Sequence, residues 1–269
     1  MANVEKLDEK NQKMEVYSNF DEYVVDEKLE LKYPNTEIKI EKKSENQFTY
    51  YRKNSLGEIT NKIIPQTGKD LKIELAPILP LNLPAKKTND LMFLRLAKPI
   101  YVEKKSNIDI IIQFPIEIGV YITNSSDNSK DFFDCFTCEP IHSRFALYGT
   151  PEMGNLCMYS KVGIVDKTEN EPYIYAFMKV SISNQLGRGV VIGKLVFPVT
   201  NHNIYYKNGE NIAHIDDIKA VIQKGHMGDV IEIEQVDYSN KSKGDLKIAP
   251  NTSTSSNNKS KFVMERGFD

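Results

Sequence analysis

Apolar and polar residues alternate with a period of two along much of the chain. Apolar positions alternate with Lys and Glu around Leu29 and again around Ile38, and the alternation returns at Leu71–Leu75, Ile108–Phe114 and Tyr173–Ser183. In an extended strand this period places the apolar side chains on one face. Outside the termini, no stretch of ten or more residues shows the period of an amphipathic helix. The pattern therefore predicts an all-β, β-sandwich-like fold with few or no long helices.

Stretches without this alternation divide the chain into segments. The first residues are polar with scattered apolar positions, and a loop of Asn, Ser and Asp begins at Asn124. Near the C-terminus, Asn251–Asn258 contains only Asn, Thr and Ser, which bury too little apolar surface to offset the entropy of ordering the chain. We expect two packed β-rich halves between a flexible N-terminal arm and a disordered tail. The expected bounds are 1–22 for the arm, 23–124 and 125–238 for the halves, and 239–269 for the tail.

Two segments that contain glycine predict turns. Asn208–Gly209 lies between two apolar runs, and this dipeptide favours a two-residue type I′ hairpin turn with positive φ at both residues. Gly187–Lys194 contains glycines and a lysine, but a phosphate-binding loop needs four residues between its glycines and Ser or Thr after the lysine. Leu195 follows the lysine here. We therefore interpret this segment as a turn between two strands.

The composition is that of an ordinary globular protein. The 269 residues are 40% hydrophobic and 27% charged, and 35 basic against 37 acidic residues give a net charge of -2. This balance creates no field that would attract a polyanion, so a protein partner or a homo-oligomer is favoured over nucleic acid. The longest apolar stretch, Ile108–Tyr121, is interrupted by charges and proline and does not predict a transmembrane segment. Because Met1–Lys13 lacks the apolar core of a secretory signal, we expect a cytoplasmic protein.

Local signatures of common enzymes do not occur in the sequence. It has no Gly-x-Ser-x-Gly elbow and no His-Glu-x-x-His motif. Asp216 and Asp217 are adjacent, so in a strand they would point to opposite faces, which is wrong for a carboxylate pair that shares a proton or a metal ion. We expect both to be solvated or to lie in a bulge. His202, His214 and His226 stand alone, and we expect surface or hydrogen-bonded histidines rather than catalysts.

One group of possible metal ligands lies in the middle of the chain, at Cys135, Cys138, His142 and Cys157. Three thiolates and an imidazole are a ligand set that tetrahedral zinc accepts. However, Cys157 stands alone beyond His142, outside a second short-spaced motif. If residues 131–137 form a strand, Cys135 and Cys138 also face opposite sides of the sheet. We therefore expect no metal site and no cofactor, and we keep a metal- or thiol-dependent enzyme that uses these residues as the alternative.

Three motifs and two further residues carry a resemblance to a known family. They are Pro80–Pro84, Phe114–Tyr121 and Ala146–Pro151, with Gly154 and Tyr159. Their order resembles an archaeal family catalogued as domain of unknown function 432, over the part of the chain from Pro77 to about Val236. The resemblance implies an archaeal cytoplasmic protein without an assigned activity. It implies no requirement for the cysteines, which weakens the case for a shared metal site.

The segment Tyr148–Pro151 with Gly154 is typical of a tight turn between two strands, in which glycines adopt unusual φ values and proline fixes one. A functional interpretation of the same segment is also open. Loops on a rigid sheet often carry binding residues, and this loop would display Arg144, Tyr148 and Tyr159. We keep these three as candidate ligand-binding residues.

Three hypotheses about function follow from these observations. The first is a non-catalytic cytoplasmic binding or assembly module, which the many short strands and the missing catalytic residues favour. The second is the metal- or thiol-dependent enzyme. The third is a sugar or small-ligand binder, which would rest on fold analogy alone.

Overall fold

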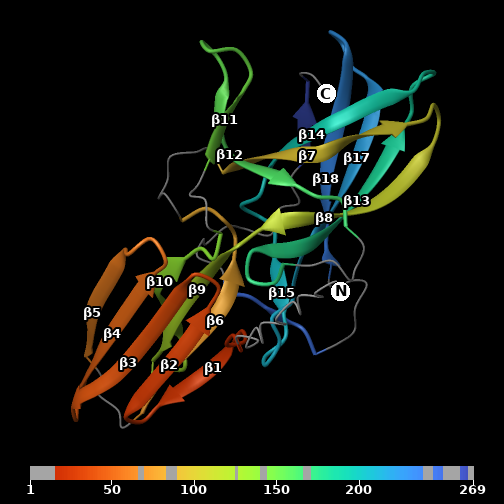
Figure 1. Cartoon of the computed structure of the whole chain (residues 1–269). Helices are drawn as coiled ribbons and strands as arrows, with labels where there is room; N and C mark the ends of the chain where they lie inside the picture. Colours follow the sequence, from red (N-terminus) through yellow and green to blue (C-terminus); the bar gives the residue numbers. More distant parts are fainter. Residues whose placement is uncertain are drawn as a thin grey trace, which may run out of the picture.

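The computed structural model describes residues 16–65, 70–82, 90–124, 127–139, 144–165, 171–238, 245–250 and 261–265. Every regular element named among them is a β-strand, so the expected all-β fold is confirmed. Within this part of the chain, no helix is long and apolar enough to cross a lipid bilayer. The strands form four sheets, and Figure 1 shows them arranged as two sandwiches.

The first sandwich consists of two four-stranded antiparallel sheets. One sheet contains β2 (Lys28–Tyr33), β3 (Thr36–Ser44), β4 (Gln47–Asn54) and β5 (Ile59–Pro65), in this order. The other contains β1 (Asp21–Val25), β6 (Leu71–Ile78), β9 (Glu117–Thr123) and β10 (Lys130–Phe136). Aromatic rings from the two sheets meet between them, for example Tyr50 with Phe133 at 5.1 Å and Tyr33 with Phe136 at 5.5 Å. These contacts make the sheets two layers around one core.

The second sandwich combines a four-stranded and an eight-stranded sheet. The smaller sheet has the order β11 (Arg144–Tyr148), β12 (Asn155–Val162), β7 (Leu91–Val102) and β14 (Val190–Pro198). The larger sheet runs through β19 (Lys247–Ile248), β15 (Ile204–Tyr206), β16 (Ala213–Ile215), β13 (Tyr175–Asn184), β17 (Asp217–Lys224), β18 (Asp229–Val236) and β20 (Lys261–Met264), and β8 (Asn107–Pro115) pairs with β13. Buried residues of both sheets, such as Leu94 and Ile182, belong to one hydrophobic core.

The sheets do not divide at the loop that begins at Asn124. Strands β7 and β8 precede this loop, yet they pair with β12, β13 and β14 of the second sandwich. Strand β10 follows the loop, yet it pairs with β9 of the first. Because β6 and β9 pair with each other, the chain leaves the first sandwich for β7 and β8 and then returns. The division at 124/125 does not match the sheets, because loop composition reports a local break whereas strand pairing joins distant segments.

Two short strands correct the expectation of a disordered tail over 239–269. Strand β20 pairs antiparallel with β18, and Met264 is fully buried. Strand β19 pairs with β15, and the Tyr121 hydroxyl donates a hydrogen bond of 2.9 Å to the Pro250 carbonyl nearby. The apolar run Phe262–Met264 is too short for alternation to identify, and it becomes a strand because β18 supplies the backbone partners. The whole of Asn251–Asn258 lies outside the described residues.

The loop that contains Asn208 and Gly209 is longer than the predicted two-residue turn. It forms a hydrogen bond to the N-terminal segment of the described chain. Strands β15 and β16 form a hairpin, but residues 207–212 connect them, and in this loop only Gly209 has a positive φ. The Gly209 N–H donates to the carbonyl of Phe20, which is fully buried. The expected two-residue turn is therefore wrong, because the longer loop places its backbone against the N-terminal segment. The arm expected over 1–22 is also too long, since Phe20 is buried, and residues 1–15 lie outside the described part.

Candidate functional site

The cysteines lie in different parts of the fold. Cys135 is in β10 of the first sandwich, Cys138 follows it, and Cys157 is in β12 of the second sandwich. Burial raises the pKa of Cys157 to about 11 and, together with the charge of Glu117, that of Cys135 to about 12. Burial also raises the pKa of Cys138. These thiols stay protonated near neutral pH, which disfavours both nucleophilic attack and metal ligation.

The described residues bring together no group of three or more His, Cys, Asp and Glu side chains that could hold a metal ion. His142, the fourth candidate ligand, lies outside them. The metal- or thiol-dependent enzyme therefore gains no support from the geometry. That the purified protein contains no stoichiometric zinc stays a prediction, which elemental analysis would test.

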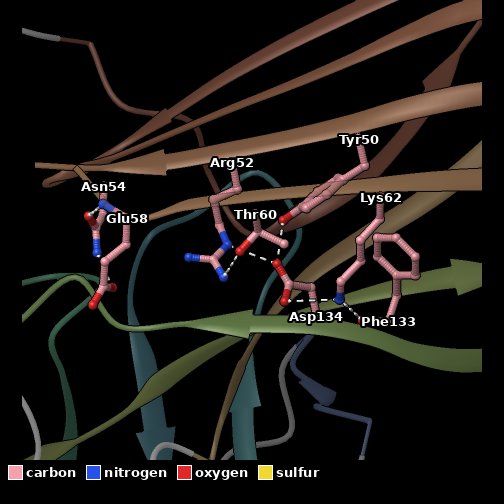
Figure 2. A network of polar contacts seen from close by, with 8 residues as sticks. All are labelled: Tyr50, Arg52, Asn54, Glu58, Thr60, Lys62, Phe133 and Asp134. Carbon is pink, nitrogen blue, oxygen red and sulfur yellow. Dashed lines mark hydrogen bonds and ion pairs between the residues drawn. The ribbon is translucent and has the colours of Figure 1, made fainter. Parts of the chain in front are cut away.

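Figure 2 shows a buried charged cluster between the two sheets of the first sandwich. The Asp134 carboxylate on β10 accepts hydrogen bonds from the Tyr50 hydroxyl at 2.9 Å and from Arg52 Nε at 2.8 Å, both on β4. Lys62 on β5 donates to the Phe133 carbonyl at 2.8 Å, and its ammonium nitrogen lies 3.3 Å from Asp134 Oδ1. The side chains of Asp134 and Arg52 are only 10% and 12% exposed. Two strands of one sheet, β4 and β5, thus supply the partners of one carboxylate on the other sheet.

Within the cluster, basic side chains and hydrogen-bond donors compensate the charge of the Asp134 carboxylate. Burial by itself would raise the pKa of Asp134, but the hydrogen bond and the charge of Arg52 outweigh it, with help from Tyr50, and hold this pKa below its usual range. Arg52 also donates to Thr60 Oγ1 at 3.0 Å. A shift in the pairing of β10 with β9 between Phe132 and Asp134 marks a β-bulge beside the carboxylate. We interpret the cluster as a link between two sheets rather than as a reactive site.

The second sandwich buries Asp216, a carboxylate that the sequence predicts to be solvated or to lie in a bulge. Asp216 is fully buried and accepts hydrogen bonds from the Tyr205 hydroxyl at 2.9 Å and from Gln235 Nε2 at 2.7 Å. It also accepts from the backbone N–H groups of Asn203 at 2.8 Å and Tyr238 at 2.9 Å. The solvated position is wrong because these four donors replace water around the carboxylate. The bulge agrees with the pairing, because β13 advances three residues from Phe177 to Val180 while the partner side advances four from His214 to Ile218. The four hydrogen bonds connect Asp216, which lies between β16 and β17, to the start of β15 and to the end of β18.

His202 and Asp217 are buried beside this carboxylate. His202 is 2% exposed, so a surface position is wrong for it, and its ring packs 5.6 Å from that of Phe197. Burial lowers the pKa of His202 to about 4, although the charge of Asp216 acts in the opposite direction. Asp217 is 3% exposed and accepts from the Lys179 N–H at 3.3 Å. These groups contribute to the core and do not line a cleft that the structure describes.

An open cleft of about 630 Å³ lies at one end of the first sandwich. The β2–β3 and β4–β5 turns form its walls, and the Ser55 N–H joins them by donating to the Asn35 carbonyl at 2.8 Å. Lys32, Glu37 and Lys53 line it from neighbouring register positions on three strands. The lining is mostly polar, whereas small-molecule sites are mostly apolar with a few polar groups. The cleft is therefore the weaker of two candidate sites.

The stronger candidate is the hairpin of β11 and β12, whose tip extends away from the sandwich in Figure 1. In its register Arg144 stands opposite Tyr159 and Tyr148 opposite Asn155. Tyr148, Cys157 and Tyr159 share one face of the hairpin, and this face packs against the body of the protein. Cys157 on it is fully buried, and the Tyr159 ring lies 5.7 Å from that of Phe93 on β7.

The opposite face of the hairpin is apolar, and it is exposed except at Met158, which is buried. Phe145 and Leu147 on β11 and Leu156 on β12 are 38%, 44% and 40% exposed, and Leu147 stands directly opposite Leu156. Met153 at the tip is 81% exposed. Sequence analysis misses these residues, because an apolar alternation predicts a buried face. The turn motif between two apolar runs indicated the hairpin. These side chains form a surface because no sheet in the described part of the chain covers them.

The turn of the hairpin agrees with its prediction. Gly149 has a φ of 124°, a value that favours glycine. At Gly154 a Cβ atom would lie 2.6 Å from the Thr150 carbonyl oxygen and 2.7 Å from Leu147 Cγ. The close approach of Gly154 therefore lets the turn pack against Leu147 and helps to hold the exposed apolar face in place.

The fold and the hairpin define an all-β protein with two sandwiches and a protruding apolar edge. The chain belongs to the family described as protein of unknown function (DUF432), whose sequence profile matches residues 19–265. Neither the curated proteins nor the solved structures contain a match to the chain. The family description names no activity, so the site itself has to indicate the function.

Two of the motifs that carry the family resemblance, Pro80–Pro84 and Phe114–Tyr121, contact each other through Asn82 and Glu117. This contact has a structural role. Both the backbone N–H and the side-chain amide of Asn82 donate to Glu117 Oε2 at 3.2 Å. Glu117 is 3% exposed. This contact joins the segment after β6 to the start of β9, where the chain returns to the first sandwich.

Proposed function

We propose that the protein is a non-catalytic binding or assembly module, and that it binds a protein partner through the exposed face of the β11–β12 hairpin. The observation that carries this proposal is the set of exposed apolar side chains at Phe145, Leu147, Met153 and Leu156. Contiguous exposed apolar residues usually mark protein interaction sites. The family resemblance further supports a cytoplasmic protein of archaeal origin as part of the same proposal.

The chemistry of the face favours protein over other partners. Aromatic residues and Met are enriched where proteins meet, and this face offers Phe145, Met153 and two leucines. Nucleic acid is bound by basic surfaces, and the chain has a net charge of -2. Arg144, Tyr148 and Tyr159 stay candidate ligand-binding residues in this proposal, and Tyr148 and Tyr159 lie on the opposite face of the hairpin.

A photo-cross-linking residue at the tip would test this function. Met153 is replaced by benzoylphenylalanine, and the matched control carries the same residue in place of Met227, which is 103% exposed on the β17–β18 turn. In extract of the source cells we expect a discrete covalent adduct from position 153 alone, identified by mass spectrometry. The adduct should disappear when Leu147→Ser and Leu156→Ser are added. Identical adducts from both positions, or none from position 153, would contradict the proposal.

A further inference from the structure

Edge strands elsewhere in the molecule carry features that prevent them from pairing with other chains. Such features are charges, proline, bulges and short length. Strands β2, β5, β8, β10 and β14 are edges with a charge inside the strand, and β5, β8 and β14 also end in proline. Strand β1 begins with two acidic residues, and β19 and β20 are only two and four residues long. The protein therefore protects most of its sheet edges.

Strand β11 is an edge without this protection. It pairs with β12 on one side, and no described strand pairs with its other side. The register of β11 with β12 runs without a bulge from Arg144 to Tyr148. Its only charged residue is the first one, and Phe145–Ala146–Leu147 in its centre are apolar. An apolar, regular edge of this kind is a template for a further strand.

We propose that a second copy of this chain binds here, and that the two β11 strands pair antiparallel about a two-fold axis at Ala146. This inference rests on the proposed function, because it names the partner of the same hairpin. The pairing would join the two four-stranded sheets into one continuous sheet across the dimer. A two-fold contact uses the same edge of both copies and forms a closed dimer, so neither copy keeps an exposed β11 edge.

The residues of β11 suit this register. With Ala146 at the axis, Phe145 of each copy stands opposite Leu147 of the other. Directly opposite residues of an antiparallel pair share a face, so both contacts fall on the exposed apolar face of the hairpin. Leu156 continues that face on β12 of each copy. The two Arg144 positions lie at opposite ends of the seam, which keeps like charges apart.

The contact is small, because five residues of edge strand and a few side chains bury less surface than a standard interface. We therefore expect a reversible dimer with a dissociation constant in the micromolar range. Sedimentation of the full purified chain over a range of concentrations measures it. A chain that stays monomeric at all concentrations overturns the inference.

A pair of matched variants tests the edge. Leu147 and Val191 are each 44% exposed, and Val191 lies on β14, the opposite edge of the same sheet. Leu147→Lys adds a charge to the centre of β11 and should raise the dissociation constant at least about tenfold. Val191→Lys should leave it unchanged. A dimer that resists Leu147→Lys, or that Val191→Lys weakens equally, places the contact elsewhere.

Charge complementation tests the register and the identity of the partner together. Phe145→Lys and Leu147→Glu should each weaken the dimer. The chain that carries both changes should regain it, because each lysine then faces a glutamate of the other copy across the axis. Loss in the single variants without recovery in the double variant overturns the two-fold register at Ala146. The far-UV circular dichroism of every variant confirms that it is folded.

The cross-linking experiment separates this inference from the function on which it rests. An adduct between two copies at position 153, in extract and in the purified protein, supports both. A monomeric purified protein that still forms a face-dependent adduct with a different protein overturns the second copy as partner but leaves the docking function standing. A monomer without a face-dependent adduct overturns both.

Discussion

In the first sandwich charged side chains lie inside, between two sheets, whereas in the second sandwich apolar side chains lie outside, on the β11–β12 hairpin. The Asp134 carboxylate is 10% exposed, and partners from β4 and β5 surround it. Leu147 is 44% exposed. Both regions reverse the usual distribution of polar and apolar groups. They differ in whether the chain itself supplies what each group needs.

The charged cluster is complete within the chain, and the hairpin face is not. A buried carboxylate costs free energy unless charges and hydrogen bonds compensate it, and Arg52, Lys62 and Tyr50 do so for Asp134. The exposed face of the hairpin has no such compensation among the described residues, since Phe145 and Leu147 remain in contact with water. The difference indicates a structural role for the cluster and supports the binding role that we propose for the hairpin.

The largest expected effect is that of removing the carboxylate from the charged cluster. Asp134→Ala leaves Arg52 buried without its ion-pair partner and should lower the free energy of unfolding by about 3–5 kcal/mol. Urea denaturation measures the change. As control, Glu30→Ala removes an exposed ion pair with Lys28 and should unfold like the wild type. Equal effects of the two substitutions would show that the cluster does not differ from a surface ion pair.

The second prediction concerns the pH dependence that buried His202 causes. Its pKa is lowered from 6.5 to about 4 by burial, so the unfolded chain binds a proton that the folded chain does not between these values. Stability from this group should be complete above pH 6.5 and lost as the pH falls toward 4, by up to about 3 kcal/mol. His202→Leu should flatten this part of the stability profile. An unchanged slope in His202→Leu would contradict the buried neutral state.

The fold class could be predicted from sequence because each strand has a local pattern of alternating apolar and polar residues. Alternation over Tyr173–Ser183 predicts the strand that the structure shows at Tyr175–Asn184. The pairing of strands has no such local pattern, since β13 pairs with β8, β16 and β17 from distant parts of the chain. The expected boundary at residue 124 and the two-residue turn at Asn208–Gly209 are wrong for this reason. In both places the local conformation depends on pairing or contact with a distant segment.

The site could be predicted only in part. The turn motif around Gly149 correctly indicated a hairpin, and loops with such motifs often carry function. Arg144, Tyr148 and Tyr159 were chosen for their polar chemistry, and the register places Tyr148 and Tyr159 on the face that packs against the body of the protein. Phe145 and Leu147 resemble core residues in sequence. Whether a sheet covers them depends on the tertiary arrangement, which the pattern of the hairpin alone does not contain.

A smaller effect is expected at the turn that shapes the hairpin. Gly154→Ala brings a Cβ atom to 2.6 Å from a backbone oxygen, so the turn must open, at a cost of about 1–2 kcal/mol. Gly187→Ala is the control, because a Cβ atom there meets nothing within 4 Å. It should be neutral or slightly stabilising. Hydrogen exchange of the hairpin amides would show whether the change is local. Equal protection of these amides in Gly154→Ala and Gly187→Ala would contradict the prediction that only Gly154→Ala opens the turn.

The smallest expected effect is the one that tests the comparison most directly. If the hairpin face serves a partner rather than the fold, then Leu147→Ser and Leu156→Ser should each change the free energy of unfolding of the monomer by no more than about 0.5 kcal/mol. Leu94→Ser, at a fully buried position of β7 in the same sheet, should cost several kcal/mol, because it leaves a cavity and buries a hydroxyl. Denaturation is measured at a protein concentration where the wild type is monomeric, so that association does not contribute. A destabilisation by the hairpin variants that approaches that of Leu94→Ser would mean that the face belongs to the core, and both regions would then have structural roles only.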